Sequence, residues 1–254
     1  MVIAIDAGNT NIHWGWFRGC RLARRAVCPS EGFNTRKGMS VLRRGPDMKG
    51  HDDVEGAVIV SVSPVLTRLL LRCLAHMHPG IKPVIVSARL KSPLKYGYQR
   101  PGTLGADRIA NAVGALVRYR TNLVVIAAGT ATTVDVVFKN GWFPGGMIVP
   151  GITTGLWALT RKTARLKKVD LTMPKKIIGR TTGECLRSGI LSGHALMVQS
   201  LLELIRRRYR RRFLCVVTGG WGKFIASHVR QGIRYDRDLS LYGALQLYHY
   251  NDLR

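Results

Sequence analysis

The sequence predicts an α/β protein made of two similar halves, and three observations support that fold class. Its 254 residues, of which 46% are hydrophobic, can bury the core of one large or two small domains. Segments with strand-like and helix-like hydrophobic periodicity alternate along the chain. A strand, a glycine-containing turn and a second strand occur twice, at residues 2–17 and 124–137. We therefore expect an N-terminal half, residues 1–119, and a C-terminal half, residues 120–254, with a cleft between them.

The first half is expected to begin with a β-hairpin. Residues 2–6 are apolar and residues 11–18 alternate in polarity, which is typical of paired strands. Residues 54–63 are apolar on both faces, as in a buried parallel strand. Pro64 favours the start of a helix, where its missing N–H is not needed. The remaining elements of this half are a helix over 65–77, a strand over 82–88 and a helix over 106–119.

The second half repeats this order of elements. Strands are expected at residues 123–127 and 134–138, and Asn140-Gly141 is a typical hairpin turn. Residues 192–212 have helical periodicity, and arginines crowd the last turns, where positive charge complements the helix dipole. A strand over 215–220 and a helix over 240–250 follow.

The net charge of +26 is the most unusual feature of the composition. The chain has 40 Lys and Arg residues against 14 Asp and Glu, with basic clusters at 21–25, 161–168 and 206–212. Such a charge attracts polyanions, including nucleotides and nucleic acids. It is equally compatible with a solvated basic surface. No known DNA-binding motif accompanies the clusters, so nucleic-acid binding is kept as an alternative but is not favoured.

The sequence indicates a cytoplasmic protein with no membrane partner. Its five cysteines form no CxxC pair, as expected for free thiols in a reducing compartment. The apolar start MVIAI is interrupted by Asp6 and lacks a preceding basic region, so no signal peptide is expected. No apolar run approaches the roughly 20 residues that a membrane-spanning helix needs.

Three glycine turns follow predicted strands and favour a phosphate or nucleotide site. They are DAGNT at 6–10, GTATT at 129–133 and TGGWG at 218–222. Gly8 lets backbone amides approach an anion closely. Asp6 cannot bind phosphate directly, but it can hold a metal ion against phosphate oxygens. One glycine turn is a weak signal, whereas three at strand ends, two of them in matching places, are harder to dismiss.

Asp107 and Arg108 lie at the expected start of the helix over 106–119. In one interpretation, Asp107 complements the helix dipole, which is common for an acid in the first turn. In the other, Asp107 is a general base beside an anion-binding arginine. The local sequence favours the two interpretations about equally.

A series of motifs resembles those of the type III pantothenate kinases and covers nearly the whole chain. The motifs are DAGNT at 6–10, YxxP at 98–101, LGADR at 104–108, GTATTVD at 129–135, PGGxIxPG at 144–151, TAxL at 163–166 and TGG at 218–220. The resemblance implies the acetate and sugar kinase/Hsp70/actin superfamily, with two ribonuclease H-like halves and the nucleotide between them. It also implies a homodimer that phosphorylates pantothenate to 4'-phosphopantothenate with ATP, the first step of coenzyme A biosynthesis.

The resemblance implies roles for particular residues. Those at ATP-binding positions are Asp6, Ala7, Gly8, Asn9, Thr10, Asn11, Ile12 and His13 in the first phosphate loop, Thr130 in the second, and Gly219 and Gly220 in the adenosine turn. Those at pantothenate positions are Tyr98, Gly105, Ala106, Asp107, Arg108 and Thr182, the last supplied across the dimer interface. Asp107 is implied to be the general base, and Asp6 is implied to lie near Mg²⁺-bound phosphates.

Two positions depart from the family pattern. When Gly129 is aligned with Gly8, Ala127 stands at the place of Asp6. The family usually has an Asp at the position of Ala127, associated with a monovalent cation such as K⁺ or NH₄⁺. Arg100 stands where an Asn usually precedes the proline. We therefore expect kinase activity with weakened or absent K⁺ dependence.

The first departure, Ala127, also concerns the alternative function, because a subgroup of relatives lacks the acid at that position too. FPGG at 143–146 and GGW at 219–221 are shared with relatives similar to the Bvg accessory factor class, which has been linked to transcriptional activation. A transcriptional accessory or nucleic-acid-binding protein on a kinase scaffold is therefore the alternative to the kinase. Steep loss of DNA binding with rising salt is the property that would support it.

Overall fold

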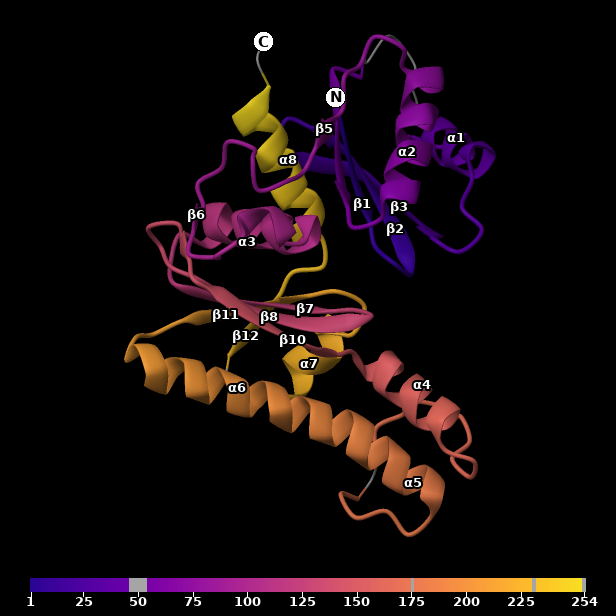
Figure 1. Cartoon of the computed structure of the whole chain (residues 1–254), viewed down its shortest axis with the longest axis vertical. Coiled ribbons are helices and arrows are strands. Elements are labelled where there is room, and N and C mark those ends of the chain that lie inside the picture. The colour runs from indigo at the N-terminus through magenta and orange to yellow at the C-terminus, as the bar shows by residue number, and fades with distance from the viewer. Residues whose placement is uncertain (46–53, 175, 230–231, 253–254) are drawn as a thin grey trace. The chain divides into compact units, whose positions relative to one another are not determined.

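A computed structural model describes residues 1–45, 54–174, 176–229 and 232–252 of the chain (Figure 1). The chain separates into two compact units by its internal contacts. The first unit contains Met1–Arg120, Asn140–Pro144 and Asp238–Arg254. The second unit contains Thr121–Lys139 and Gly145–Arg237.

The first unit contains a five-stranded sheet in the order β3-β2-β1-β4-β5. Strands β1, β2 and β3 pair antiparallel, whereas β4 and β5 extend the sheet parallel to β1. Ile3 and Ile5 of β1 lie opposite Trp16 and Trp14 of β2, and all four side chains are fully buried. The strands are β1 (Val2–Ala7), β2 (Asn11–Arg18), β3 (Arg21–Pro29), β4 (Gly56–Ser61) and β5 (Val84–Ile85).

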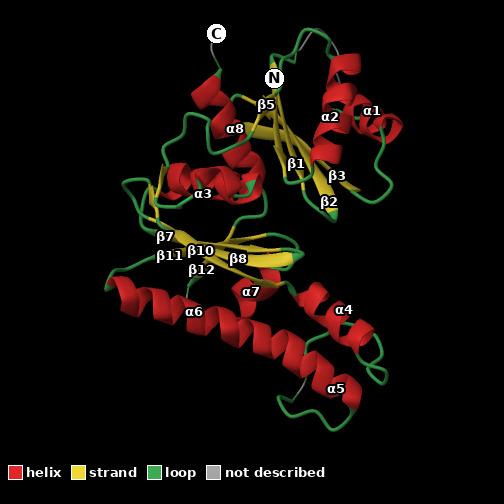
Figure 2. Ribbon diagram, in the orientation of Figure 1, coloured by secondary structure: helices red, strands yellow, loops and turns green. Residues whose placement is uncertain are grey.

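Helices cover both faces of this sheet, as Figure 2 shows. The isoleucines of β1 pack with α1 (Thr35–Arg43) and α2 (Pro64–Met77) in one apolar cluster. The opposite face meets α8 (Leu239–Asn251), which itself packs on α3 (Ala106–Tyr119). Alternation along β1 places Asp6 on this second face, because successive side chains of a strand point to opposite sides.

Two glycines allow α3 and α8 to cross at close range. A Cβ atom at Gly114 of α3 would lie 2.6 Å from the carbonyl oxygen of Leu239. A Cβ atom at Gly243 of α8 would overlap the carbonyl group of Ala110. Any larger residue at either position would force the two backbones apart.

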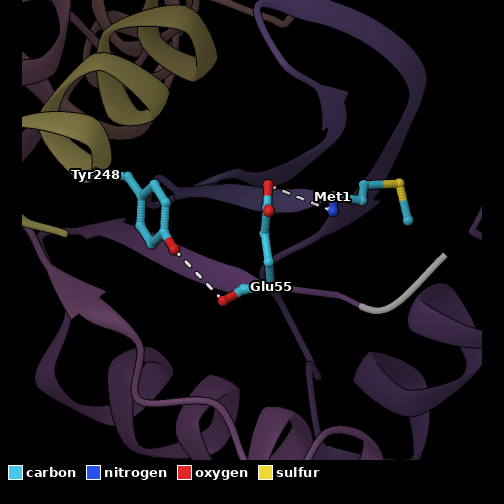
Figure 3. Close-up of polar contacts among 3 residues, drawn as sticks. All are labelled: Met1, Glu55 and Tyr248. Atoms are coloured by element: carbon cyan, nitrogen blue, oxygen red, sulfur yellow. Dashed lines mark hydrogen bonds and ion pairs between the residues drawn. The ribbon is translucent and has the colours of Figure 1, made fainter. Parts of the chain in front are cut away.

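A polar contact also holds α8 to the sheet (Figure 3). The Tyr248 hydroxyl donates a hydrogen bond to the backbone carbonyl of Glu55, at 3.4 Å. The carboxylate of Glu55 pairs with the amino group of Met1 at 3.4 Å. The C-terminal helix is therefore tied to the chain at the starts of β1 and β4.

The second unit repeats the sheet of the first. Its strand order is β10-β8-β7-β11-β12, and the first two pairings are antiparallel and the last two parallel. The predicted repeat is therefore confirmed, and the two sheets match each other in strand order and in strand direction. The strands are β7 (Leu123–Ala128), β8 (Ala131–Val137), β10 (Gly145–Pro150), β11 (Leu214–Thr218) and β12 (Ile233–Tyr235). The helices are α4 (Ile152–Lys162), α5 (Thr182–Arg187), the π-helical η2 (Ser188–Ser192), α6 (Gly193–Tyr209) and α7 (Gly222–His228).

The expected boundary lies near residue 119. Two later segments nevertheless belong to the first unit by their contacts. Residues 238–254 follow the second unit in sequence but pack with the first, through the crossing of α3 and α8. Residues 140–144 also belong to the first unit, because β9 (Trp142–Phe143) pairs with β6 (Lys95–Tyr96). The expected strand at 82–88 is only two residues long, as β5.

Strands β3 and β10 were not expected from the sequence, since neither has an apolar face of even spacing bounded by clear turns. β3 contains the basic RLARR segment and is mostly exposed or half-buried. It is nonetheless paired along its length with β2. Pairing with a neighbouring strand, rather than the β-propensity of their own residues, defines these two strands.

The helix running continuously through Thr182–Tyr209 is long and apolar enough, by length and composition, to cross a membrane. Within its most apolar stretch, 44% is buried inside the protein. Val198, Leu202 and Ile205 of this helix belong to the apolar cluster beneath β7, β8 and β11. These contacts are those of a helix that packs on the sheet of its own unit.

Candidate active site

The first predicted phosphate loop is the turn between β1 and β2. Asp6 pairs with His13 in the ladder, and Ala7 pairs with Ile12. The amide of Gly8 donates to the carbonyl of Asn11 at 3.0 Å and closes the turn. Asn9 and Thr10 are exposed at the tip, which leaves their side chains accessible to a ligand.

Ser30, which follows β3, anchors this turn. Its hydroxyl donates to the carbonyl of Gly8 at 2.7 Å, and its amide donates to the carbonyl of Thr10 at 2.9 Å. Both ends of the DAGNT turn are therefore held from a neighbouring strand. A turn fixed in this way presents its backbone donors without having to be ordered on binding.

Asp6 and Asp107 lie close enough to interact electrostatically within the first unit. Burial raises the pKa of Asp6 from its ordinary value of 3.8 to about 6. The nearby Ser240 hydroxyl lowers the pKa, and the negative charge of Asp107 raises it further. The structure thus brings together a strand end, the start of α3 and the start of α8 around two carboxylates.

Asp107 lies in the first turn of α3, two residues after its N-cap residue Gly105. The cap has no side-chain hydrogen bond, and one oxygen of Asp107 would be 2.5 Å from a Cβ atom at Gly105. The carboxylate therefore lies over the glycine at the helix start. This position is compatible with both interpretations of Asp107, the dipole partner and the general base.

Arg108 is held by two aromatic residues. Its side chain is 5% exposed, and one of its Nη atoms donates to the Tyr98 hydroxyl at 3.3 Å. The guanidinium carbon lies 5.7 Å from the centre of the Tyr98 ring and 6.0 Å from the centre of the Phe143 ring. Such cation–π contacts fix the direction of the guanidinium group.

Phe143 was missed by the sequence analysis as a residue of this site. It is fully buried and reaches the first unit through the short parallel pairing of β6 and β9. Its ring also contacts Tyr98, with 6.5 Å between the ring centres. The FPGG motif was the available signal, but only the contacts show that its aromatic residue supports Arg108.

The second predicted phosphate loop is the turn between β7 and β8. The amide of Gly129 donates to the carbonyl of Ala131 at 3.0 Å, so this turn is one residue shorter than the first. Ala127 occupies the strand position that matches Asp6, opposite Thr133. The matching of Gly129 with Gly8 is therefore confirmed, and the second turn has no carboxylate at that place.

Residues 150–154 brace the second turn. The carbonyl of Thr130 accepts from the amide of Gly151 at 3.0 Å and from the hydroxyl of Thr154 at 2.6 Å. A Cβ atom at Gly151 would lie 2.6 Å from the same carbonyl oxygen, so only glycine fits. Thr130 is itself exposed, as a contact to ATP requires.

The TGGWG turn lies against the same part of the second unit. Gly219 has a φ of 89°, and a Cβ atom there would lie 2.5 Å from the carbonyl oxygen of Ala128. The amide of Trp221 donates to that carbonyl at 3.1 Å, and its indole N–H donates to the Thr153 hydroxyl at 3.0 Å. Trp221 and Thr153, which the sequence analysis did not select, thus join the two glycine turns.

Thr182 is the first residue of α5, in the second unit. The cap residue Thr181 accepts from the amide of Glu184 at 3.3 Å, and Glu184 accepts from the amide of Arg180 at 2.7 Å. These two hydrogen bonds, the first a side-chain N-cap, fix the start of the helix. The other predicted pantothenate residues, Tyr98 and Gly105–Arg108, lie in the first unit.

Within the part of the chain that the structure describes, no three His, Cys, Asp or Glu side chains form a metal-binding group. Asp6 offers one half-buried carboxylate with a second, Asp107, nearby. This set fits Mg²⁺, which commonly binds through one or two carboxylates and substrate phosphates while keeping several waters.

The fold resembles those of several solved structures. A conserved protein from Campylobacter jejuni, described as a Baf family transcriptional activator, aligns with a TM-score of 0.63 at 19% identity, over 97% of both chains. The activator of 2-hydroxyisocaproyl-CoA dehydratase from Clostridium difficile aligns with a TM-score of 0.56 at 11% identity, over 98% of this chain and 94% of the other. An inorganic polyphosphate/ATP-glucomannokinase from Arthrobacter aligns with a TM-score of 0.51 at 14% identity, over 98% of both.

These likenesses define the fold class of the protein, an α/β fold of two units whose sheets share one strand order. The chain belongs to the type III pantothenate kinase family, whose model matches residues 2–204. A type III pantothenate kinase of Roseiflexus castenholzii is 35% identical over 254 residues, covering 99% of each chain. That of Thermomicrobium roseum is 36% identical over 255 residues, covering 98% of this chain and 96% of the relative.

The raised pKa of Asp6 predicts a pH-dependent gain in stability for the variant Asp6→Asn. The unfolded chain loses this proton near pH 4, whereas the folded protein keeps it until about pH 6. Ionisation of Asp6 therefore destabilises the folded protein at pH 7.5, by about 1–3 kcal/mol. The free energy of urea unfolding should favour Asp6→Asn at pH 7.5, and the advantage should shrink towards pH 4. The exposed Asp170→Asn is the matched control, and an equal pH-dependent gain there would contradict the explanation.

Proposed function

We propose that the protein transfers the γ-phosphoryl group of ATP to pantothenate and forms 4'-phosphopantothenate, the first step of coenzyme A biosynthesis. Membership of the type III pantothenate kinase family supports this reaction. The observation that carries it is the grouping of Asp6, Asp107 and Arg108 in the first unit. These residues supply a metal-facing carboxylate, a candidate base and an anion-binding group.

Asp107 acts as the general base in this proposal. Phosphoryl transfer depends mainly on positioning and charge neutralisation, but the primary hydroxyl of pantothenate must lose its proton as the new P–O bond forms. A carboxylate at the start of α3 can accept that proton. Arg108 binds the carboxylate or an amide oxygen of pantothenate, with its direction set by Tyr98 and Phe143.

ATP contacts the two glycine turns and the adenosine turn in this proposal. The first phosphate loop, residues 6–13, with its fixed DAGNT turn, and the exposed Thr130 offer donors to the phosphates. Gly220 has open space beside its backbone for the adenosine, and Gly219, at a φ of 89°, forms the turn that presents it. Mg²⁺, when bound with ATP near Asp6, would offset negative charge on the triphosphate.

The variant Asp107→Asn should lose most of the kinase activity. Removal of a general base lowers the turnover number by about 10²–10⁴-fold. The measurement is steady-state phosphorylation of pantothenate by the purified protein with ATP and Mg²⁺, and Asp170→Asn serves as the control for a surface carboxylate. Undiminished turnover in Asp107→Asn would disprove the assigned base. A panel of other small alcohols would show whether pantothenate is the preferred acceptor.

Kinase activity should depend little on monovalent cations. Ala127 occupies the place of a carboxylate in the second turn and offers no ligand for K⁺ or NH₄⁺. We expect turnover in a sodium-free organic buffer to change less than about twofold when K⁺ or NH₄⁺ is added, since one carboxylate ligand is missing. Strong activation by K⁺ would show that another group binds the cation.

A homodimer would complete the pantothenate site with Thr182 from a second copy. Trp157 of α4 and Leu196 and Leu204 of α6 are each more than half exposed, and burying such apolar side chains against a second copy would stabilise a dimer. Mixing inactive Asp107→Asn with inactive Thr182→Ala should restore up to about a quarter of wild-type activity, through mixed dimers with one intact site each. Sedimentation of the mixture should give twice the monomer mass. No restored activity in a proven dimer would place Thr182 outside the partner's site.

A further inference from the structure

A buried hydrogen bond in the second unit joins the second glycine turn to α6. The Thr132 hydroxyl and the Nε2 atom of His194 are 3.0 Å apart. Thr132 is 1% exposed and His194 is 9% exposed. A buried hydrogen bond of this kind is costly to break, because the polar group left behind has no access to water.

The first hairpin shows that the fold does not need a polar residue at this place. Thr132 pairs with Ala128 in the second hairpin, and the matching pair in the first is Ile12 with Ala7. Ile12 is fully buried in an apolar cluster. The second copy therefore has a hydroxyl and an imidazole where the first copy has only hydrocarbon, and their mutual hydrogen bond offsets the cost of burying them.

The helix is distorted immediately before His194. The π-helical turn η2 spans Ser188–Ser192, and the amide of Gly193 donates to the carbonyl of Ser188, five residues earlier. Such π turns shift the register of the side chains that follow, and they occur frequently at functional sites. Here the distortion ends at the residue before the imidazole that reaches Thr132.

His194 also borders the residues that brace the turn. A cavity of about 160 Å³ is lined by His194 and Met197 of α6 and by Pro150, Gly151 and Ile152. Gly151 is the residue whose amide holds the carbonyl of Thr130. Helix α6 therefore contacts the second glycine turn directly, at Thr132. It also shares the lining of this cavity with Gly151, which holds Thr130.

We propose that His194 is a positioning residue for ATP, which acts through Thr132 to fix the turn that carries Thr130. This inference rests on the proposed function, because it assumes that the second turn contacts the nucleotide. His194 itself does not touch ATP. Its hydrogen bond keeps the β7–β8 turn ordered before the nucleotide binds, so that less ordering remains to be done on binding.

The test measures nucleotide binding apart from turnover. Calorimetry gives the dissociation constant of a non-hydrolysable ATP analogue with Mg²⁺, and steady-state kinetics give KM for ATP and for pantothenate. His194→Phe and Thr132→Val should each raise the dissociation constant and the KM for ATP about five- to tenfold, the effect of one lost hydrogen bond. KM for pantothenate should stay within about twofold of wild type, since the change is local to the turn.

Conservative variants and a double variant separate positioning from simple destabilisation. Thr132→Ser and His194→Gln keep a hydrogen-bonding group and should retain most of the affinity for the analogue. The double variant His194→Phe/Thr132→Val should be no weaker than the worse single variant, because both remove the same interaction. Ser188→Ala is the matched control, since it removes a partly buried hydrogen bond of the same helix, from the buried Ser188 hydroxyl to the carbonyl of Ile177.

An equal loss of nucleotide affinity in Ser188→Ala, additive losses in the double variant, or unchanged affinity in His194→Phe would each overturn the inference. If His194→Phe does not fold, the comparison of Thr132→Val with Thr132→Ser decides. A wild-type protein that binds the analogue but does not phosphorylate pantothenate would instead contradict the proposed function. The effect of His194 on nucleotide affinity would still be measurable in that case.

Discussion

The close crossing of α3 and α8 is the constraint on which the first unit depends. Two glycines, Gly114 and Gly243, let the helix backbones meet where any side chain would collide with a carbonyl group. The crossing sets where both helices begin. Asp107 lies at the start of α3 and Ser240 at the start of α8, and both influence the carboxyl group of Asp6. The electrostatics of the candidate site thus follow from a packing contact that involves none of its residues.

The two halves use one architecture for different tasks. In the first half, a polar side chain at a strand end, Asp6, is kept in a partly buried place that disfavours its charge. In the second half, the matching position is the apolar Ala127. The buried polar side chain there is Thr132, which belongs to the next residue pair towards the turn. Duplication supplied two equivalent turns, and the chemistry has been divided between them.

The repeat could be predicted because each copy is a short, continuous stretch of sequence. Gly8 and Gly129 each follow directly after an apolar strand. In both units the turn that contains this glycine joins two antiparallel strands. Phe143, Ser240 and His194 could not be found in this way. Each acts on a residue more than 30 positions away, and hydrophobic periodicity contains no information about which distant segment it will meet. The basic strand β3 was missed for a related reason, since its partner β2 and not its own composition makes it a strand.

Because α8 belongs to the first unit, that unit cannot finish folding early in translation. When the first 120 residues have left the ribosome, all five strands of the first sheet are present, but the helix that covers one of its faces is not. That face includes Gly15, where an added Cβ atom would lie 3.2 Å from the side chain of Leu241 of α8, and it stays without this cover until α8 emerges. The first half to be translated is therefore the last to be completed, and a chain truncated before α8 would retain an unfinished N-terminal sheet.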